Sequence, residues 1–221
     1  MKVLIVNHEE VRQHLPMSDC IKTMEKALTL LDRGEAMNPL RNVVWLPDKT
    51  GLMAMMPACL SEPAVMGLKA ISVFPGNSAT EFDSHQGVIM LFEIRNGRLL
   101  ALIDATEVTA IRTAAVSGVA TNLLAGEDAA NLAVLGVGTQ AQKHLEAMVA
   151  VRNIKRVRVW NRHFEGAKLF SDTMARQYKL EVEALASARD AVAEADIICT
   201  TTSAIEPVLE GDWIAPGTHI N

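Results

Sequence analysis

The stretch LAVLGVGTQAQ, residues 132–142, decides the fold of the second half of this chain. It joins an apolar run to the start of an amphipathic helix pattern, and Gly136, Gly138 and Ala141 follow the spacing G-x-G-x-x-A. In a strand–turn–helix unit the first glycine permits the tight turn, the second lets the backbone approach a pyrophosphate, and the third small residue keeps the helix close to the sheet. The amide groups that open the helix can then hold the phosphates. The stretch predicts a dinucleotide-binding turn, and the alternative is a plain strand-to-helix turn.

The second strand of this unit ends in Asn161-Arg162-His163, where a site for NAD usually carries Asp or Glu. A carboxylate at this point would repel a ribose 2′-phosphate. Asn161 can instead donate a hydrogen bond to that phosphate, and the Arg162 guanidinium can pair with it. We therefore expect NADPH as the cofactor in preference to NADH. The alternative is that Arg162 and His163 simply begin a solvated helix.

Around this turn, strands alternate with helices, which predicts a parallel sheet of Rossmann type over residues 126–221. The polar break AGEDAAN, residues 125–131, is the expected domain boundary. The expected strands are residues 132–136, 156–160, 181–186 and 196–201, with another beginning at 218. The expected helices are residues 139–151, 163–177 and 187–195.

Residues 1–125 predict an α+β domain in front of the Rossmann domain, so the whole chain is of the α/β class. Ser18 can cap a helix over residues 18–34 that Gly34 ends. The expected strands are residues 43–47, 52–58, 68–74, 87–94 and 98–104, the last two joined by the hairpin signal Asn96-Gly97. Asp104 and Glu107 resemble a capping box that opens a helix of small residues over 105–124.

Composition excludes several classes of function. The net charge is −5 and the pI about 5.7, so we expect no nucleic-acid or anionic-membrane partner. No stretch approaches the ~18 apolar residues of a membrane span. Cys20, Cys59 and Cys199 are odd in number and lack metal-ligand spacing, so we expect no metal and a reducing, cytoplasmic location. Because Asn221 lies in an expected buried strand, we interpret the chain as C-terminally truncated.

Several segments together resemble the ornithine cyclodeaminase/mu-crystallin family, in the family's order and over most of the chain. They are MMPA (55–58), GLKAISVFPGN (67–77), SHQGVIMLFE (84–93), TAIRTAAVSGVAT (109–121), LGVGTQAQ (135–142), VWNR (159–162) and EPVLEGDWIAPGTHIN (206–221). The resemblance implies an N-terminal substrate-binding and dimerisation domain followed by a Rossmann domain, and hence a homodimer. VWNR is similar to the NADPH-binding branch, whereas the family's cyclodeaminases tend to carry an acid there.

Three cations, Arg41, Lys69 and Arg112, stand in apolar or small-residue sequence surroundings and need anionic partners if buried. Family members handle small α-imino or α-amino acids, and the resemblance implies that these three residues contact the substrate carboxylate. Structural salt bridges are the alternative. Lys69 is also a candidate catalytic proton donor, because a reductase must keep its imine protonated while hydride arrives.

Further residues match family positions that contact the cofactor. They are Ser84, Arg112, Thr113, Gln140, Ala141 and Thr202, beside Gly136, Gly138, Asn161 and Arg162 of the motifs above. For Ser84, a turn cap is the alternative role. Two departures stand out: Cys59 occupies a position that is often aromatic in the family, and the cyclodeaminase catalytic aspartate would lie beyond Asn221.

The resemblance therefore implies an NAD(P)H-dependent reductase of small cyclic ketimino acids, such as Δ1-pyrroline- or Δ1-piperideine-2-carboxylate. One alternative is ornithine cyclodeaminase, which converts ornithine to proline and ammonia without net use of the cofactor. A second is a non-enzymatic, mu-crystallin-like protein that binds NADPH and a hormone. An alanine dehydrogenase is disfavoured by the missing acid.

Overall fold

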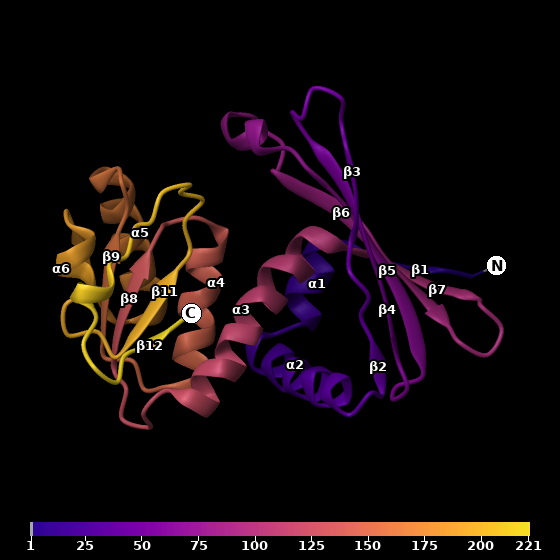
Figure 1. Cartoon of the computed structure of the whole chain (residues 1–221), viewed down its shortest axis with the longest axis horizontal. Helices are drawn as coiled ribbons and strands as arrows, with labels where there is room; N and C mark the ends of the chain where they lie inside the picture. Colours follow the sequence, from indigo (N-terminus) through magenta and orange to yellow (C-terminus); the bar gives the residue numbers. More distant parts are fainter. Residues whose placement is uncertain (1) are drawn as a thin grey trace. The chain divides into compact units, whose positions relative to one another are not determined.

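The computed structural model describes residues 2–221, with Ser78 and Ala79 described by their backbone alone. These residues form two compact units, each built on one sheet (Figure 1). Unit 1 contains residues 2–16 and Thr23–Thr109, and unit 2 contains Met17–Lys22 and Ala110–Asn221. Helix α3 (Ala105–Leu124) contributes to both units, and the expected boundary between residues 125 and 126 stays a prediction. The expected fold class, an α+β part followed by a Rossmann-type sheet, is confirmed.

Unit 2 is a parallel five-stranded sheet in the order β10-β9-β8-β11-β12. Its strands are β8 (Asn131–Leu135), β9 (Arg156–Trp160), β10 (Glu181–Leu185), β11 (Ile197–Thr200) and β12 (His219–Ile220). Its helices after α3 are α4 (Thr139–Val151), α5 (Phe164–Tyr178), α6 (Ala188–Val192) and the 3-10 turn η2 (Gly211–Trp213). The chain leaves β8 towards β9, whereas β11 lies on the other side of β8. This reversal is the point at which open α/β sheets bind ligands, beyond the carboxyl ends of the strands.

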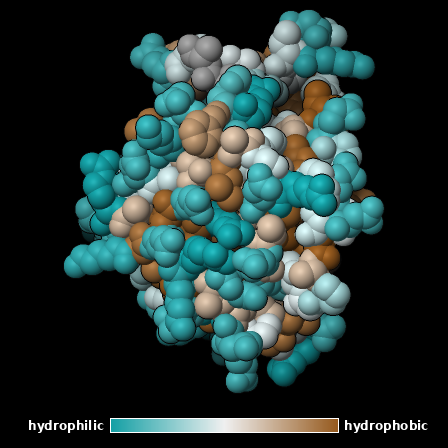
Figure 2. Space-filling model, turned by 90° about the vertical axis from the view of Figure 1, so that its left-hand side faces the viewer, coloured by the Kyte–Doolittle hydropathy of each residue, from teal (hydrophilic) through white to brown (hydrophobic). Residues whose placement is uncertain are grey.

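The central strands of this sheet are apolar on both faces because helices cover both faces. Ala133 and Leu135 pack against Ala191 and Val192 of α6, and all four are buried. Between them, Val134 is also fully buried. Figure 1 shows these strands between α6 and α4. The face of the molecule drawn in Figure 2 is covered mostly by hydrophilic residues.

Unit 1 is a seven-stranded, largely antiparallel sheet in the order β1-β7-β6-β5-β4-β2, and β3 also pairs with β4. The strands are β1 (Leu4–Val6), β2 (Ala36–Met37), β3 (Asn42–Trp45), β4 (Leu52–Leu60), β5 (Val65–Val73), β6 (His85–Glu93) and β7 (Leu99–Asp104). Strand β1 alone pairs in parallel, with β7. One face of the sheet forms a core in which Ala54 and Ile71 pack with Ala105 at the start of α3. Along each strand, every second side chain points to this core face and the others point to the opposite face.

The N-terminal segment contains two elements that the sequence-based prediction missed. Residues 8–14 form α1 (His8–His14), which packs along β7, and residues 4–6 form β1. The signal for α1 was a capping box: Asn7 Oδ1 accepts from the backbone N–H of Glu10, and Glu10 Oε2 accepts from the backbone N–H of Asn7. Three residues make too short a strand for periodicity to reveal it.

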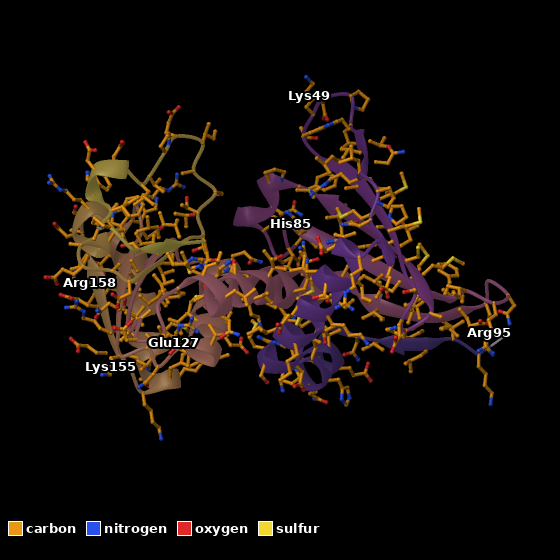
Figure 3. All side chains as sticks on the ribbon, turned by 60° about the horizontal axis from the view of Figure 1, so that its bottom comes forward. Lys49, His85, Arg95, Glu127, Lys155 and Arg158 are labelled. Atoms are coloured by element: carbon orange, nitrogen blue, oxygen red, sulfur yellow. The ribbon has the colours of Figure 1, made fainter. Side chains whose placement is uncertain are left out.

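One expected helix cap was wrong, and one expected hairpin is confirmed with a four-residue turn. Helix α2 (Met17–Asp32) begins after Pro16, so Ser18 lies inside the helix and does not cap it, while Gly34 ends it with a φ of +72° as expected. The β6–β7 hairpin forms, but only Gly97 of the pair Asn96-Gly97 has positive φ. The turn spans four residues, because Glu93 exchanges backbone hydrogen bonds with Arg98 and Gly97. Figure 3 shows Arg95 at this tip and Lys49 at the tip of the β3–β4 hairpin.

Helix α3 uses its small residues for close packing. A Cβ on Gly118 would lie 2.9 Å from Ile21 Cδ1 and 3.6 Å from Ala147 Cβ, so glycine lets α2 and α4 approach. The Asp104 carboxylate caps the helix by accepting from the Glu107 backbone N–H at 2.8 Å. The Glu107 carboxylate faces the Arg12 guanidinium at 3.3 Å and the His8 ring at 3.6 Å. Within the described residues, no helix is both long and apolar enough to cross a membrane.

Candidate active site

The glycine turn after β8 has the geometry that the sequence predicts. Gly136 has a φ of +117°, and its backbone N–H donates to the Trp160 carbonyl at 2.8 Å. A Cβ on this residue would lie 2.5 Å from the Thr201 carbonyl oxygen. Two features therefore require glycine at residue 136: the positive φ, and the close approach of the segment that follows β11.

Gly138 is the N-cap residue that directly precedes α4, and it leaves the helix start open. Its φ of −82° suits any residue, and a Cβ on it would meet no atom within 4 Å. Among the described residues no side chain caps the first turn of α4, so the amide groups of that turn have no side-chain acceptor. Ala141 is fully buried against the sheet, and Gln140 is half-buried. This arrangement suits a pyrophosphate.

The segment after β11 forms the second wall of the turn, and it includes a residue that the sequence reading missed. Thr201 donates to the Leu135 carbonyl twice, from its backbone N–H at 2.8 Å and from its hydroxyl at 3.1 Å. The next residue, Thr202, is exposed, and its hydroxyl accepts from the Ala204 N–H at 2.8 Å. Thr201 thus fixes the strand ends beside Gly136 and leaves Thr202, the predicted contact, at the surface. A hydroxyl directly after an apolar strand was the available signal.

The end of β9 places Asn161 and Arg162 differently. The Asn161 amide donates to the His163 carbonyl at 3.1 Å and packs on Gly166, where a Cβ would lie 3.0 Å from Asn161 Nδ2. Asn161 therefore shapes the turn into α5, and its amide is engaged locally. The Arg162 side chain is exposed at the carboxyl end of the sheet, where a guanidinium can pair with a phosphate.

A buried histidine connects the start of α4 to α3, and the sequence reading missed it. His144 is 7% exposed; its Nδ1 lies 2.8 Å from the Gln140 carbonyl oxygen and its Nε2 lies 3.1 Å from Ser117 Oγ. Because a carbonyl only accepts, Nδ1 carries the proton and Nε2 accepts from the serine hydroxyl. Burial lowers the pKa of His144, and the Gln140 carbonyl offsets this in part, so the ring is neutral at pH 7. The uniform helical periodicity of α4 gave no signal that this position is polar and buried.

Lys69, the predicted proton donor, lies on β5 between β4 and β6. Its direct neighbours in the sheet are Met56 and Ile89, which belong to the face that carries the core of unit 1. Lys69 is half-buried, and its Nζ donates to Thr109 Oγ1 on α3 at 3.3 Å. An ammonium group is thus held at an otherwise apolar face of the sheet, as its sequence surroundings predicted.

Arg112 and Thr113 stand on α3, one turn after Thr109, and both are half-buried. Arg112 acts on Cys20 of α2: burial raises the pKa of the Cys20 thiol, and the positive charge of Arg112 lowers it in part. Arg112 is therefore a partly desolvated cation within a packed region. Such a group can bind a carboxylate in a two-pronged geometry.

Arg41 is exposed, which corrects the expectation that it lies in buried, apolar surroundings. The edge of the sheet explains this difference, because β2 and β3 both pair with β4 and the chain between them, residues 38–41, leaves the sheet. Leu40, the apolar neighbour on which the expectation rested, is 97% exposed. Arg41 directly precedes Asn42, which is paired with Met55.

Ser84 precedes β6 and serves the local turn. Its carbonyl accepts from the Phe74 N–H at 2.8 Å, and its hydroxyl lies 3.0 Å from His85 Nδ1. His85 is exposed, and its carbonyl accepts from the Thr106 hydroxyl at 3.2 Å. Figure 3 shows His85 in unit 1 at this strand start. The contact between Ser84 and a nucleotide stays a prediction.

The residues of the glycine turn fit a dinucleotide. The tight turn at Gly136, the open space at Gly138 and the uncapped first turn of α4 all lie at the strand reversal between β8 and β11. Such an arrangement suits the phosphates of a dinucleotide. Unit 1 separately holds the Lys69 ammonium at an otherwise apolar face of its sheet.

Comparison with known proteins agrees with this geometry. The model of the ornithine cyclodeaminase/mu-crystallin family matches residues 1–221. Ketimine reductase mu-crystallin of Mus musculus is 39% identical over 217 residues, covering 96% of this chain and 68% of that protein.

Two solved structures share the fold of nearly the whole chain. The Δ1-pyrroline-2-carboxylate reductase of Thermococcus litoralis, in complex with NADH and L-proline, has a TM-score of 0.94 and 34% identity, covering 99% of this chain and 68% of that chain. An archaeal alanine dehydrogenase dimer with bound NAD has a TM-score of 0.92 and 30% identity, covering 100% of this chain and 67% of that chain.

Proposed function

The chain belongs to the ornithine cyclodeaminase/mu-crystallin family, and from that premise we propose that it is an NAD(P)H-dependent reductase of small cyclic ketimino acids. The proposed substrates are Δ1-pyrroline-2-carboxylate and Δ1-piperideine-2-carboxylate. The observation that carries the proposal is the nucleotide cradle at Gly136 and Gly138, in a chain similar along its length to a reductase holding NADH and L-proline. A cyclic imine reduced at its C=N bond gives a cyclic amino acid of the proline type.

When bound, the nicotinamide supplies a hydride to the imine carbon. The chain's own residues would bind the pyrophosphate at the first turn of α4 and hold the substrate carboxylate with Arg41, Lys69 and Arg112. Lys69 and Arg112 are half-buried, which strengthens their attraction for an anion relative to an exposed pair. Arg41 is exposed and would act with less desolvation.

Lys69 has a second proposed role, because the imine must carry a proton on nitrogen to accept hydride at carbon. An ammonium Nζ can hold or supply that proton. If Lys69→Ala weakens only substrate affinity and leaves turnover intact, the role as proton donor is wrong. The carboxylate-binding role would then stand alone.

We also propose that NADPH is preferred to NADH. Arg162 is exposed at the carboxyl end of β9, and no acidic residue stands between Trp160 and Phe164 to accept from a ribose 2′-hydroxyl. A guanidinium there would pair with the 2′-phosphate. Three free thiols, Cys20, Cys59 and Cys199, support the accompanying proposal of a reducing, cytoplasmic setting.

Absorbance of the reduced nicotinamide tests the function directly. The protein is mixed with NADPH or NADH and, in turn, Δ1-pyrroline-2-carboxylate, Δ1-piperideine-2-carboxylate, pyruvate with ammonia, and ornithine. A ketimine reductase oxidises NADPH with the cyclic imines. Conversion of ornithine to proline without net oxidation would identify a cyclodeaminase, and tight NADPH binding with no turnover would identify a binding protein.

We further propose that the chain forms a homodimer through the face of the unit 1 sheet that lies opposite its core. By register, this face carries Ile5, Val44, Met53 and Met66, which are 70%, 56%, 52% and 38% exposed. A hollow of about 470 Å³ on it is lined by apolar residues that include Pro57, Leu68 and Phe92. Exposed apolar faces of this kind are typical of protein interfaces, and the archaeal relative named above is a dimer.

Light scattering after size-exclusion chromatography tests the dimer. The double variant Val44→Glu/Met53→Lys should give the monomer mass, because it places charges in the proposed interface. Leu169→Glu is the matched control, since Leu169 is a 69% exposed leucine on α5 in unit 2. A wild-type monomer, or a dimer in the double variant, would contradict this interface.

A further inference from the structure

Two hydrogen bonds of the Thr109 hydroxyl have directions that follow from the chemistry of their partners. Thr109 Oγ1 lies 2.5 Å from the Ala105 carbonyl oxygen and 3.3 Å from Lys69 Nζ. A carbonyl only accepts, so the hydroxyl proton points to Ala105. The hydroxyl oxygen therefore presents a lone pair to Lys69 and accepts one of its N–H groups.

Both anchors of this contact are rigid. Ala105 is fully buried in the core of unit 1, and Thr109 follows it by one turn of the same helix. Thr109 is β-branched, so its side chain has few rotamers in a helix. Lys69 stands on a strand that is paired on both sides. The flexible part of the pair is the lysine side chain, which gains a fixed acceptor for its tip.

A threonine inside a helix often donates to the carbonyl four residues before it without any further role. That ordinary bond explains the contact with Ala105, but it does not explain an ammonium group brought to the same oxygen from another element. In α2, the exposed Thr29 makes this ordinary bond, from its hydroxyl to the Glu25 carbonyl at 2.9 Å. The lysine contact distinguishes Thr109.

We propose that Thr109 is a positioning residue that sets the orientation of the Lys69 ammonium. The inference rests on the proposed function, in which Lys69 binds the substrate carboxylate and holds the imine proton. A neutral hydroxyl orients the ammonium without cancelling its charge, whereas a carboxylate in its place would compete with the substrate. The hydroxyl accepts from an ammonium and, more weakly, from a neutral amine, so it favours the charged form of Lys69 and still orients the side chain after proton transfer.

The test compares Thr109→Val, which keeps the shape and removes the hydroxyl, with Thr109→Ser, which restores the hydroxyl. We expect Thr109→Val to lower kcat/KM for the cyclic imine about tenfold or more, since a hydrogen bond to a charged group is lost. Thr109→Ser should stay within about threefold of the wild type, and the Kd for NADPH should not change in either variant. Thr29→Val is the matched control for a helical threonine and should leave all constants unchanged.

Labelling of Lys69 with an amine reagent, followed by mass spectrometry, gives a readout that does not need activity. Loss of the acceptor destabilises the ammonium, so Lys69 should react about threefold faster in Thr109→Val and at the wild-type rate in Thr109→Ser. If Thr109→Val fails to fold by circular dichroism, Thr109→Ala replaces it. Wild-type labelling and wild-type kinetics in the hydroxyl-deleted variant would overturn the proposal, as would equal losses in Thr109→Val and Thr109→Ser.

The proposed function can fail separately. If the wild type oxidises no reduced nicotinamide with any imine, the function is wrong, while the labelling comparison still decides whether Thr109 orients Lys69. If the wild type is active and the hydroxyl deletion changes neither readout, only the role of Thr109 is wrong.

Discussion

The Thr201 carbonyl oxygen occupies the space into which a side chain at residue 136 would project, 2.5 Å from where a Cβ on Gly136 would stand. Thr201 is held there by two hydrogen bonds to the Leu135 carbonyl. One side of the glycine turn is thus closed by the segment that follows β11, the strand beside β8 in the sheet. This relationship separates the two glycines of the motif, because Gly136 serves the fold and Gly138 faces open space.

We expect Gly136→Ala to destabilise the protein. The alanine would carry a φ of +117°, and its Cβ would require Thr201 to move. The cost should be about 2–4 kcal/mol, from backbone strain together with the displaced segment. Chemical denaturation monitored by circular dichroism measures the loss, and a Gly136→Ala variant as stable as the wild type would contradict the close approach.

Gly138→Ala should separate binding from stability. Its φ of −82° is ordinary and its Cβ would meet nothing within 4 Å, so the free energy of unfolding should change by less than about 0.5 kcal/mol. The same methyl group would stand where the backbone approaches a pyrophosphate, and the Kd for NADPH should rise about tenfold or more. Calorimetric titration tests this, and unchanged affinity would mean that the phosphates bind elsewhere.

The sequence predicted the regular parts of unit 2 well, for a physical reason. Helix α4 and strand β9 have the expected bounds, because their apolar periods match the two faces that they bury. Helix α6 is shorter than expected, ending at Val192, and Glu194 beyond it has a φ of +59° that no local pattern announces. Apolar periodicity predicts helices and strands, but it does not predict the backbone conformation of a single residue such as Glu194.

The candidate site was predicted in part. The glycine positions follow from a local motif, whereas Thr201 and His144 act through residues 66 and 27 positions away in the chain. Such contacts depend on strand order and helix packing, which one sequence does not display. Arg41 shows the opposite error, since apolar neighbours in sequence do not bury a residue where the edge strand is interrupted.

Arg162→Ala should change the choice of cofactor. We expect the Kd for NADPH to rise about tenfold, through the loss of one guanidinium–phosphate pair, while the Kd for NADH changes little. Arg176→Ala is the control. Arg176 is an exposed arginine in the last turn of α5, the helix that follows Arg162, and it donates to the Asp172 carbonyl. Equal changes for both cofactors in Arg162→Ala would show that Arg162 does not read the 2′-phosphate.

His144 should make stability depend on pH. Burial lowers its folded pKa below the ordinary value of 6.5, so near that pH the unfolded chain binds more protons than the folded one. The stabilising contribution is complete above pH 6.5 and is lost as the pH falls from 6.5 through the folded pKa. His144→Asn keeps a donor for the Gln140 carbonyl but does not titrate, so its melting temperature should fall less steeply below pH 6.5. Parallel curves for the two proteins would contradict the lowered pKa.

Arg152 closes the carboxyl end of α3, and its removal should destabilise unit 2. Its guanidinium donates at 2.9 Å to each of the carbonyls of Thr121, Ala125 and Gly126, at and just beyond the last turn of the helix. A positive charge at this end also interacts favourably with the negative pole of the helix dipole. Arg152→Ala should therefore lower the free energy of unfolding by about 2–3 kcal/mol.

Arg152→Lys should recover only part of that stability, because one ammonium cannot reproduce the planar fork that reaches three separate carbonyls. Lys155→Ala is the control, since Lys155 is an exposed cation that directly precedes β9 and extends away from the sheet (Figure 3). Urea denaturation of the four proteins distinguishes the explanations. Full recovery of stability in Arg152→Lys would assign the effect to charge alone. The geometry instead predicts that the hydrogen bonds of the guanidinium account for most of the stability.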